Sequence, residues 1–129
     1  MKSRLRTLTV HGAEYGYSIK HRFERLQGQV DGSWHTTLTL YRMGFQNSWL
    51  KVHFHTADDY AQGNLLLQTS TDPTRPNLHT PGTVRELLDH AHALGWTGDH
   101  VSMEVEDGLP WLVDCGFEIG HLQLHDAQK

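Results

Sequence analysis

The chain has 129 residues, a formal net charge of −4 with histidine neutral, and eleven histidines. A chain of this length fits one folded domain, so we expect a single domain over residues 1–129. With one cysteine, Cys115, an internal disulfide is excluded, and the longest apolar runs are too short to span a bilayer. These counts exclude a disulfide-stapled secreted domain and a helical membrane protein.

Charge is distributed unevenly along the chain. Residues 1–25 carry a formal charge of +4, whereas the remaining residues carry −8. The basic start suggests contact with nucleic acid, but a pI of about 6.2 is unlike that of a nucleic-acid binder. Pairing of the basic strands with acidic ones is the simpler interpretation. The first residues also lack the apolar run of a secretion signal, so we expect a cytoplasmic location.

The first half of the chain alternates with period two, which is typical of strands with one buried face. Alternation is clearest over residues 15–23, where one face would hold Tyr15, Tyr17, Ile19, His21 and Phe23. Further strands are predicted over 5–10, 34–41, 49–55 and 65–69, with turns near 11–12 and 44–47. The pattern predicts an antiparallel meander.

A helix is predicted over residues 81–94. Thr80 suits the N-cap, Pro81 the first helical position and Gly95 the C′ position. An alternative start one turn later would use Thr83 and Glu86 as a capping box. The apolar stripe that would pack on the sheet comprises Val84, Leu87, Leu88, Ala91 and Leu94.

The remaining residues predict one more strand and a polar tail. Residues 101–106 alternate, and residues 111–113 would extend or return that strand. We expect the tail over 118–129 to fray. Together these elements predict an α+β fold, a mostly antiparallel β-meander sheet with one main amphipathic helix packed on one face.

The helical segment also carries a resemblance. The residues that carry it are Thr80, Pro81, Val84, Arg85, Leu87, Leu88, Ala91, Gly95 and Trp96. This pattern resembles a segment of small uncharacterised bacterial proteins and covers 17 of the 129 residues. Because it consists mostly of capping and packing positions, the resemblance implies a small bacterial domain and no particular activity.

Three histidines form the strongest candidate site. His53 and His55 lie two apart on a predicted strand and therefore share a face. If residue 40 pairs with residue 50, His35 lies opposite His55 on that same face. Three histidines plus water is a known catalytic zinc arrangement. The simpler interpretation is an outward polar row, because no carboxylate stands nearby in sequence to complete the site.

Other candidate groups have simple structural interpretations. Asp89 and His92 would share a face of the predicted helix, and His121 and His125 would meet only if the tail were helical. Glu104 and Glu106 would share a strand face, as a pair of carboxylates for acid–base chemistry would require. Each group is as readily a solvated surface. Cys115 follows an apolar run and an aspartate, which disfavours a reactive thiolate.

No motif for nucleotide binding, zinc proteolysis, thiol redox chemistry or serine hydrolysis is present, so a non-enzymatic role leads. The first hypothesis is a binding or accessory module that contacts a protein partner or itself through Trp34 and Trp49. The alternatives are a zinc-type metal protein or enzyme using His35, His53 and His55, and a nucleic-acid contact through the basic strands. Apart from that metal, no cofactor is expected. Protonation of all eleven histidines would carry the charge from −4 to +7, so we expect strong pH sensitivity.

Overall fold

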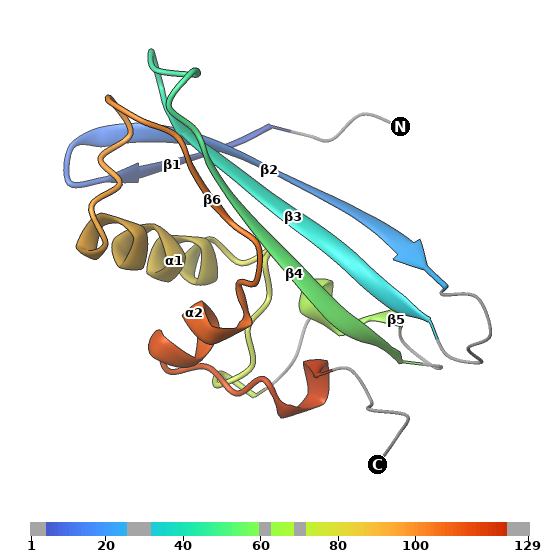
Figure 1. The fold of residues 1–129 in the computed structure, drawn as a ribbon. Helices are drawn as coiled ribbons and strands as arrows, with labels where there is room; N and C mark the ends of the chain where they lie inside the picture. The colour runs from blue at the N-terminus through green and yellow to red at the C-terminus, as the bar shows by residue number, and fades with distance from the viewer. Residues whose placement is uncertain (1–4, 26–31, 60–62, 69–71, 124–129) are drawn as a thin grey trace.

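The computed structural model describes residues 5–25, 32–59, 63–68 and 72–123. Its strands are β1 (Arg6–Val10), β2 (Ala13–Glu24), β3 (Ser33–Arg42), β4 (Leu50–Asp59), β5 (Gly63–Asn64) and β6 (Met103–Val105). Its helices are α1 (Pro81–Ala93) and α2 (Leu109–Asp114), with short 3-10 turns η1 (Leu65–Leu67) and η2 (Gly120–Leu122). The predicted α+β class is confirmed: strands β1 to β5 form an antiparallel meander that curves as a half-barrel, with one main helix (Figure 1).

Tight turns set the register of the meander. His11 and Gly12 both have positive φ, as a two-residue turn between β1 and β2 requires. In the next hairpin Leu40 pairs with Leu50, which is the register expected to place His35 opposite His55. β6 joins the free edge of β4 in parallel, with Met103 opposite Leu50. The strand predicted over 101–106 is therefore present over Met103–Val105, but its parallel pairing with β4 was not predicted.

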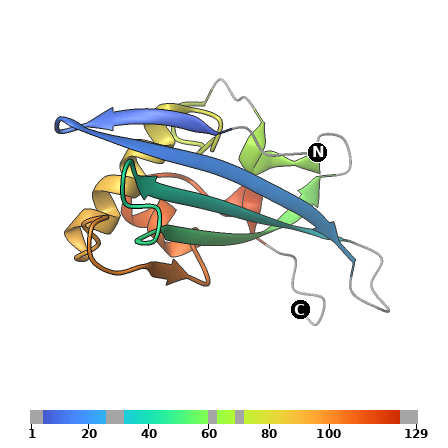
Figure 2. The same ribbon diagram turned by 90° about the horizontal axis from the view of Figure 1, so that it is seen from above.

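Both α-helices lie on the same face of the sheet, as the two ribbon views agree (Figures 1 and 2). The core forms between them and the sheet, where the side chains of β3 and β4 on that face are fully buried. These side chains are Leu38, Leu40, Leu50, Val52 and Phe54. They meet the stripe of α1 formed by Val84, Leu87, Leu88 and Ala91. The opposite face of β2, β3 and β4 is polar, and neither α1 nor α2 lies on it.

The ends of α1 follow the sequence closely. Gly95 has a φ of 106°, and its N–H donates to the His92 carbonyl while the Trp96 N–H donates to the Ala91 carbonyl. This pair of bonds is a Schellman motif, which satisfies the last carbonyls of the helix. At the start, Pro81 is the first helical residue, as predicted. The alternative capping box is wrong, because Thr83 is buried and accepts a bond from the Asn77 N–H.

Several local expectations are wrong. Leu65–Leu67 forms the 3-10 turn η1 rather than a strand, since Asn64 caps it by accepting from the Leu66 N–H; residue 69 lies outside the described residues. Residues 111–113 belong to α2, where Trp111 and Leu112 pack into the core. Leu94 is 55% exposed, because the helix has already ended.

The remaining differences lie at the ends of strand β2 and of the chain. Phe23 is 40% exposed, because the apolar face of β2 runs past the core. In the tail, Leu122 of η2 is fully buried, and residues 124–129 lie outside the described residues, so fraying of 118–129 stays a prediction. Among the described residues, none of the helices has the length and apolar character to cross a membrane.

Candidate metal site on the open face of the sheet

Four strands place polar side chains together on the open face of the sheet. In β3 and β4 the pairs His35–His55 and Thr37–His53 are directly opposite each other. Because alternate residues of a strand share a face, these side chains lie on the side away from the core. β6 brings Glu104 opposite Lys51 on the far edge of β4, two residues from His53. The hairpin register and the parallel strand together build the site.

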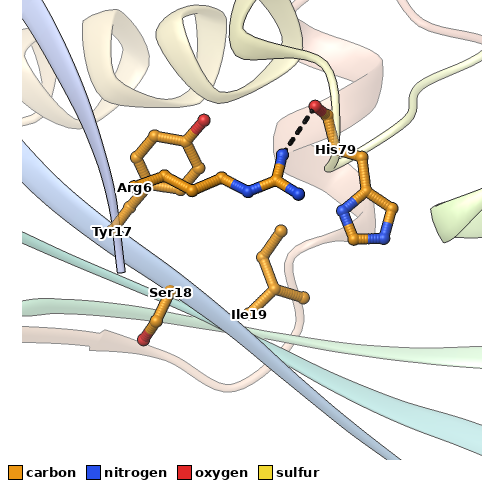
Figure 3. A pocket seen from close by; sticks show the side chains of 5 residues that line it. All are labelled: Arg6, Tyr17, Ser18, Ile19 and His79. Atoms are coloured by element: carbon orange, nitrogen blue, oxygen red, sulfur yellow. Dashed lines mark hydrogen bonds between the residues drawn. The ribbon is translucent and has the colours of Figure 1, made fainter. Parts of the chain in front are cut away.

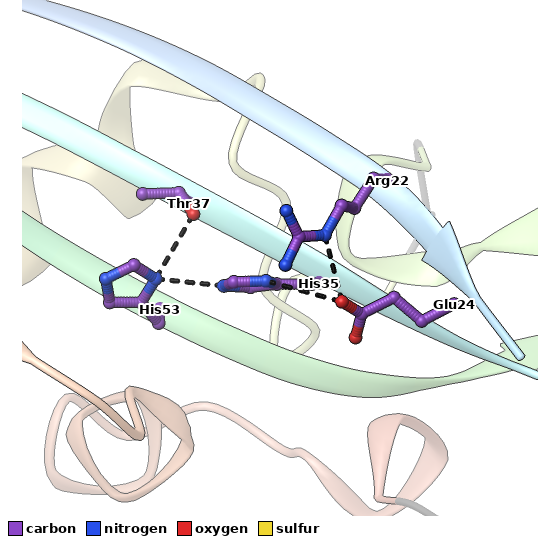
Figure 4. Close-up of polar contacts among 5 residues, drawn as sticks. All are labelled: Arg22, Glu24, His35, Thr37 and His53. Carbon is purple, nitrogen blue, oxygen red and sulfur yellow. Dashed lines mark hydrogen bonds and ion pairs between the residues drawn. The ribbon is translucent and has the colours of Figure 1, made fainter. Parts of the chain in front are cut away.

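The side chains form a continuous row of polar contacts across the strands (Figure 4). Arg22 Nε donates to Glu24 Oε2 at 2.9 Å, and that oxygen lies 3.9 Å from His35 Nδ1. His35 Nε2 and His53 Nδ1 are 2.9 Å apart. His53 Nε2 lies 2.6 Å from Glu104 Oε2. The row thus runs from an ion pair on β2 through two imidazoles on β3 and β4 to a carboxylate on β6.

The direction of each hydrogen bond follows from the groups at its ends. An ionised carboxylate only accepts, so His53 Nε2 carries the proton toward Glu104. When His53 is neutral, its Nδ1 is then an acceptor, and it accepts a hydrogen bond from His35 Nε2 or from the Thr37 hydroxyl at 3.2 Å. The side chains of His35 and His53 are only 17% and 15% exposed, so water competes weakly for these bonds.

Burial and neighbouring charges favour the neutral form of His35 by lowering its pKa. Burial, more than any other cause, lowers the pKa of His35, and the neighbouring His55 and Arg22 lower it further. Glu24 acts in the opposite sense but does not reverse the direction. A neutral imidazole retains a free lone pair, which is the form that binds a metal or accepts a proton.

Within the described ranges of the chain, two sets of three groups have ligand atoms that all lie within 4.8 Å of one another and could hold a metal ion. One set is Glu24, His35 and His55; the other is His53, Glu104 and Glu106. The three predicted histidines do converge, with His35 stacked on His55 at 4.4 Å between ring centroids. However, their nitrogens are divided between the two sets rather than shared by one. Coordination by His35, His53 and His55 together remains a prediction.

Sequence reasoning missed the carboxylates of this site. Glu24 lies 11 residues before His35, and Glu104 lies 51 residues after His53. Acidic strands were expected to pair with the basic strands near the start of the chain, but the Glu104 carboxylate contacts His53 instead. The parallel pairing of β6 with β4 brings Glu104 beside His53. Alternation within residues 101–106 indicates a strand but does not predict which strand it pairs with.

The other predicted groups are held in local contacts. Asp89 lies 3.8 Å from Arg85, whereas His92 stacks on Trp96 and its Nε2 is 3.2 Å from the Tyr15 hydroxyl. The shared helix face therefore does not unite Asp89 and His92. His121 is in the short turn η2, and His125 lies outside the described residues.

The environment of Cys115 disfavours the reactive thiolate form. Burial raises its pKa to about 11, and the nearby Glu86 and Asp114 add to the effect. The thiol also donates to the Glu86 carbonyl at 3.4 Å. These contacts agree with the expectation of an unreactive cysteine.

The four tryptophans are not equally available to a partner. Trp96 and Trp111 are buried in the core, which removes them as anchors. Trp34 is partly exposed and its Nε1 donates to Asp58 at 2.8 Å, while Trp49 is partly exposed beneath the Lys51 ammonium. A binding role for Trp34 and Trp49 stays a prediction.

The basic residues of the first strands do not share one face. Arg6 lies on the helix side of the sheet and bonds to the His79 carbonyl, whereas Arg22 lies on the open side and pairs with Glu24. Residues 1–4, with their two basic side chains, lie outside the described residues. A nucleic-acid contact through these strands is untested.

Comparison with known proteins adds no identification. No protein family model, curated protein or solved structure matches this chain. Function is therefore inferred from the geometry of the open face of the sheet.

Proposed function

We propose that this protein binds one divalent transition-metal ion, of the zinc type, through His53, Glu104 and Glu106. The observation that carries the proposal is the convergence of these ligand atoms from two segments that are distant in sequence, with His53 on β4, Glu104 on β6 and Glu106 just after β6. Imidazole and carboxylate are ligands that zinc accepts, and three protein ligands leave a position open for water or another group. Two carboxylates also balance the two positive charges of the ion.

Charge favours this set over the set of Glu24, His35 and His55. Glu24 Oε2 is already bonded to the Arg22 guanidinium, whose positive charge would repel a cation there. The rings of His35 and His55 are also stacked, with 25° between their planes, so their lone pairs do not point toward one point without rotation. These obstacles disfavour a second ion, and we expect one ion per chain.

The residues around Glu104 leave its carboxylate available to bind a metal ion. Lys51 lies opposite Glu104 in the strand pairing, yet its ammonium lies 4.8 Å from the centre of the Trp49 ring. Glu104 bonds to His53 at 2.6 Å, and two ligands of a tetrahedral ion with bonds of about 2.1 Å stand roughly 3.4 Å apart. Binding therefore requires the two ligand atoms to separate by less than about 1 Å. The Glu104 side chain is 43% exposed and can make this movement.

The remainder of the polar row orients the histidine ligand. When an ion replaces the proton on His53 Nε2, the proton of a neutral His53 resides on Nδ1. That N–H then donates to His35 Nε2, whose own proton shifts to Nδ1 and faces Glu24. Outer groups of this kind hold a ligating histidine in the right tautomer and orientation. His35 and Glu24 are therefore positioning residues in this proposal.

Calorimetric titration with zinc tests the proposal. We expect one ion per chain, with affinity weakened at least about tenfold in His53→Gln and Glu104→Gln, and roughly 10–100-fold in His35→Ala. His90→Gln is the matched control, because His90 lies on α1 beside Asp114 and outside both ligand sets. Its affinity should equal that of the unaltered protein.

Absence of zinc binding at micromolar concentrations would contradict the proposal. So would equal affinities for the unaltered protein, His53→Gln and Glu104→Gln. Circular dichroism of each variant separates loss of a ligand from loss of the fold.

A further inference from the structure

A small cavity lies on the opposite side of the sheet from the histidine row. It has a volume of about 100 Å³ and is lined by Arg6, Tyr17, Ser18, Ile19 and His79 (Figure 3). β1 ends its pairing with β2 at Arg6 and Tyr17, so β2 continues beyond this point without a described neighbour on that edge. The cavity occupies the step between this edge and the loop that leads into α1. With water taking about 30 Å³ per molecule, it has room for a group of a few heavy atoms.

Arg6 supplies a positive charge without a carboxylate partner. Its Nη1 donates to the His79 carbonyl at 3.1 Å, which fixes the guanidinium across the cavity (Figure 3). No acidic side chain in the described part of the chain forms an ion pair with it. By contrast Arg22, Arg42 and Arg85 each lie within 4.0 Å of a carboxylate. The Nε and Nη2 groups of Arg6 remain as a fork, a geometry suited to carboxylate and phosphate oxygens.

Tyr17 adds a buried polar group to the cavity wall. Its side chain is 1% exposed, and its hydroxyl forms no hydrogen bond with a described residue. The hydroxyl is therefore available to donate a hydrogen bond to an acceptor that enters the cavity. The ring of Tyr17 and the side chain of Ile19 form apolar walls.

The groups that act on His79 are basic rather than acidic. Partial burial lowers the pKa of His79 most, and the charges of Arg6 and His21 lower it further. No carboxylate is among the causes. Arg6 therefore brings a permanent positive charge to this imidazole although the chain is acidic overall.

We infer that this cavity is a binding site for a small oxyanion group, a carboxylate or a phosphate, held by the Arg6 fork and the Tyr17 hydroxyl. Both groups donate protons, which selects a ligand rich in acceptor oxygens. The ligand is an anion, and a metal ion is excluded from this wall by the guanidinium. The site is independent of the metal site, because it lies on the other face of the sheet and shares no residue with it.

Nuclear magnetic resonance titrations can test the assignment. The ring signals of His79 and Tyr17 are followed while acetate or inorganic phosphate replaces chloride at constant ionic strength. We expect at least one of the two anions to shift both signals in a saturable manner in the millimolar range. The bound negative charge should also raise the pKa of His79, which a pH titration with and without the anion measures.

Two variants and a control make the assignment falsifiable. Arg6→Gln should abolish saturation, and Tyr17→Phe should weaken it roughly tenfold while keeping the fold, because the ring that packs the core is retained. Arg85→Gln, on the exposed side of α1, should bind as the unaltered protein does. No saturable shift with either anion, or an affinity unchanged by Arg6→Gln or Tyr17→Phe, would overturn the assignment. Comparison of acetate with phosphate identifies the preferred oxyanion.

Discussion

Thr36 and Thr56 show how strongly one hydrogen bond depends on its partner. Both are fully buried on the helix side of β3 and β4. Thr36 Oγ1 accepts a bond from Asn64 Nδ2 at 2.9 Å, whereas Thr56 Oγ1 has no partner among the described residues. The same side chain is therefore satisfied at one position and costly at the other.

Replacement of each threonine by valine should have opposite effects. We expect Thr56→Val to stabilise the protein by about 1 kcal/mol, because an unsatisfied hydroxyl is removed with little change of shape. Thr36→Val should destabilise it by about 1 kcal/mol, because the amide of Asn64 loses its acceptor. Urea unfolding measures both. Equal changes of the same sign would show that the bond to Asn64 does not contribute.

At the scale of elements, the end of α1 depends on a backbone conformation that favours glycine. Gly95 has a φ of 106°, whereas Gly82, in the first turn of the same helix, has helical backbone. A Cβ added at Gly82 would meet only Thr80 Cγ2, at 4.0 Å. The two positions therefore offer a matched pair of substitutions in one helix.

Alanine at these two positions should change stability in opposite directions. Gly95→Ala should cost about 1 kcal/mol, because alanine is strained in the left-handed region. Gly82→Ala should gain about 0.5–1 kcal/mol, because it limits the unfolded chain without strain in the helix. Thermal unfolding followed by circular dichroism checks both. A stabilising Gly95→Ala would contradict the role assigned to the Schellman motif.

Secondary-structure elements also differ in how well the sequence predicts them. Alternation and turn residues predicted the meander, and the pairing of residue 40 with residue 50 brought His35 opposite His55. Short segments were harder: Leu65–Leu67 and Trp111–Val113 are apolar runs without a period, so strand and helix could not be separated. Glu104 was not predicted to meet His53, because no local pattern encodes a parallel pairing across the intervening helix.

At the scale of the whole molecule, histidine burial should make stability depend on pH. Burial is the largest cause that lowers the pKa of His35, His79, His92 and His121 in the folded protein. Between these lowered values and the unfolded value of about 6.5, the unfolded chain binds more protons. Their contribution to stability is therefore full above about pH 6.5 and is lost as the pH falls below it.

Thermal unfolding at pH 7.5, 6.5 and 5.5 measures this effect. We expect the melting temperature to fall as the pH is lowered through this range. Asp72 and Asp99, whose carboxyl pKa values are lowered mainly by hydrogen bonds from Thr74 and Thr97, lose their contribution only at more acidic pH. His92→Gln should reduce the dependence. A melting temperature that is constant or rises on acidification would refute the assigned directions.

The metal proposal is tested most directly by the nitrogen resonances of the histidine rings. Long-range ¹⁵N spectra, recorded before and after one equivalent of zinc is added, report which nitrogen of His53 carries a proton. We predict that zinc binds Nε2 of His53 and leaves the proton on Nδ1, which faces His35. Unchanged nitrogen resonances of His53 in the presence of zinc would contradict the proposal, whichever other histidines respond.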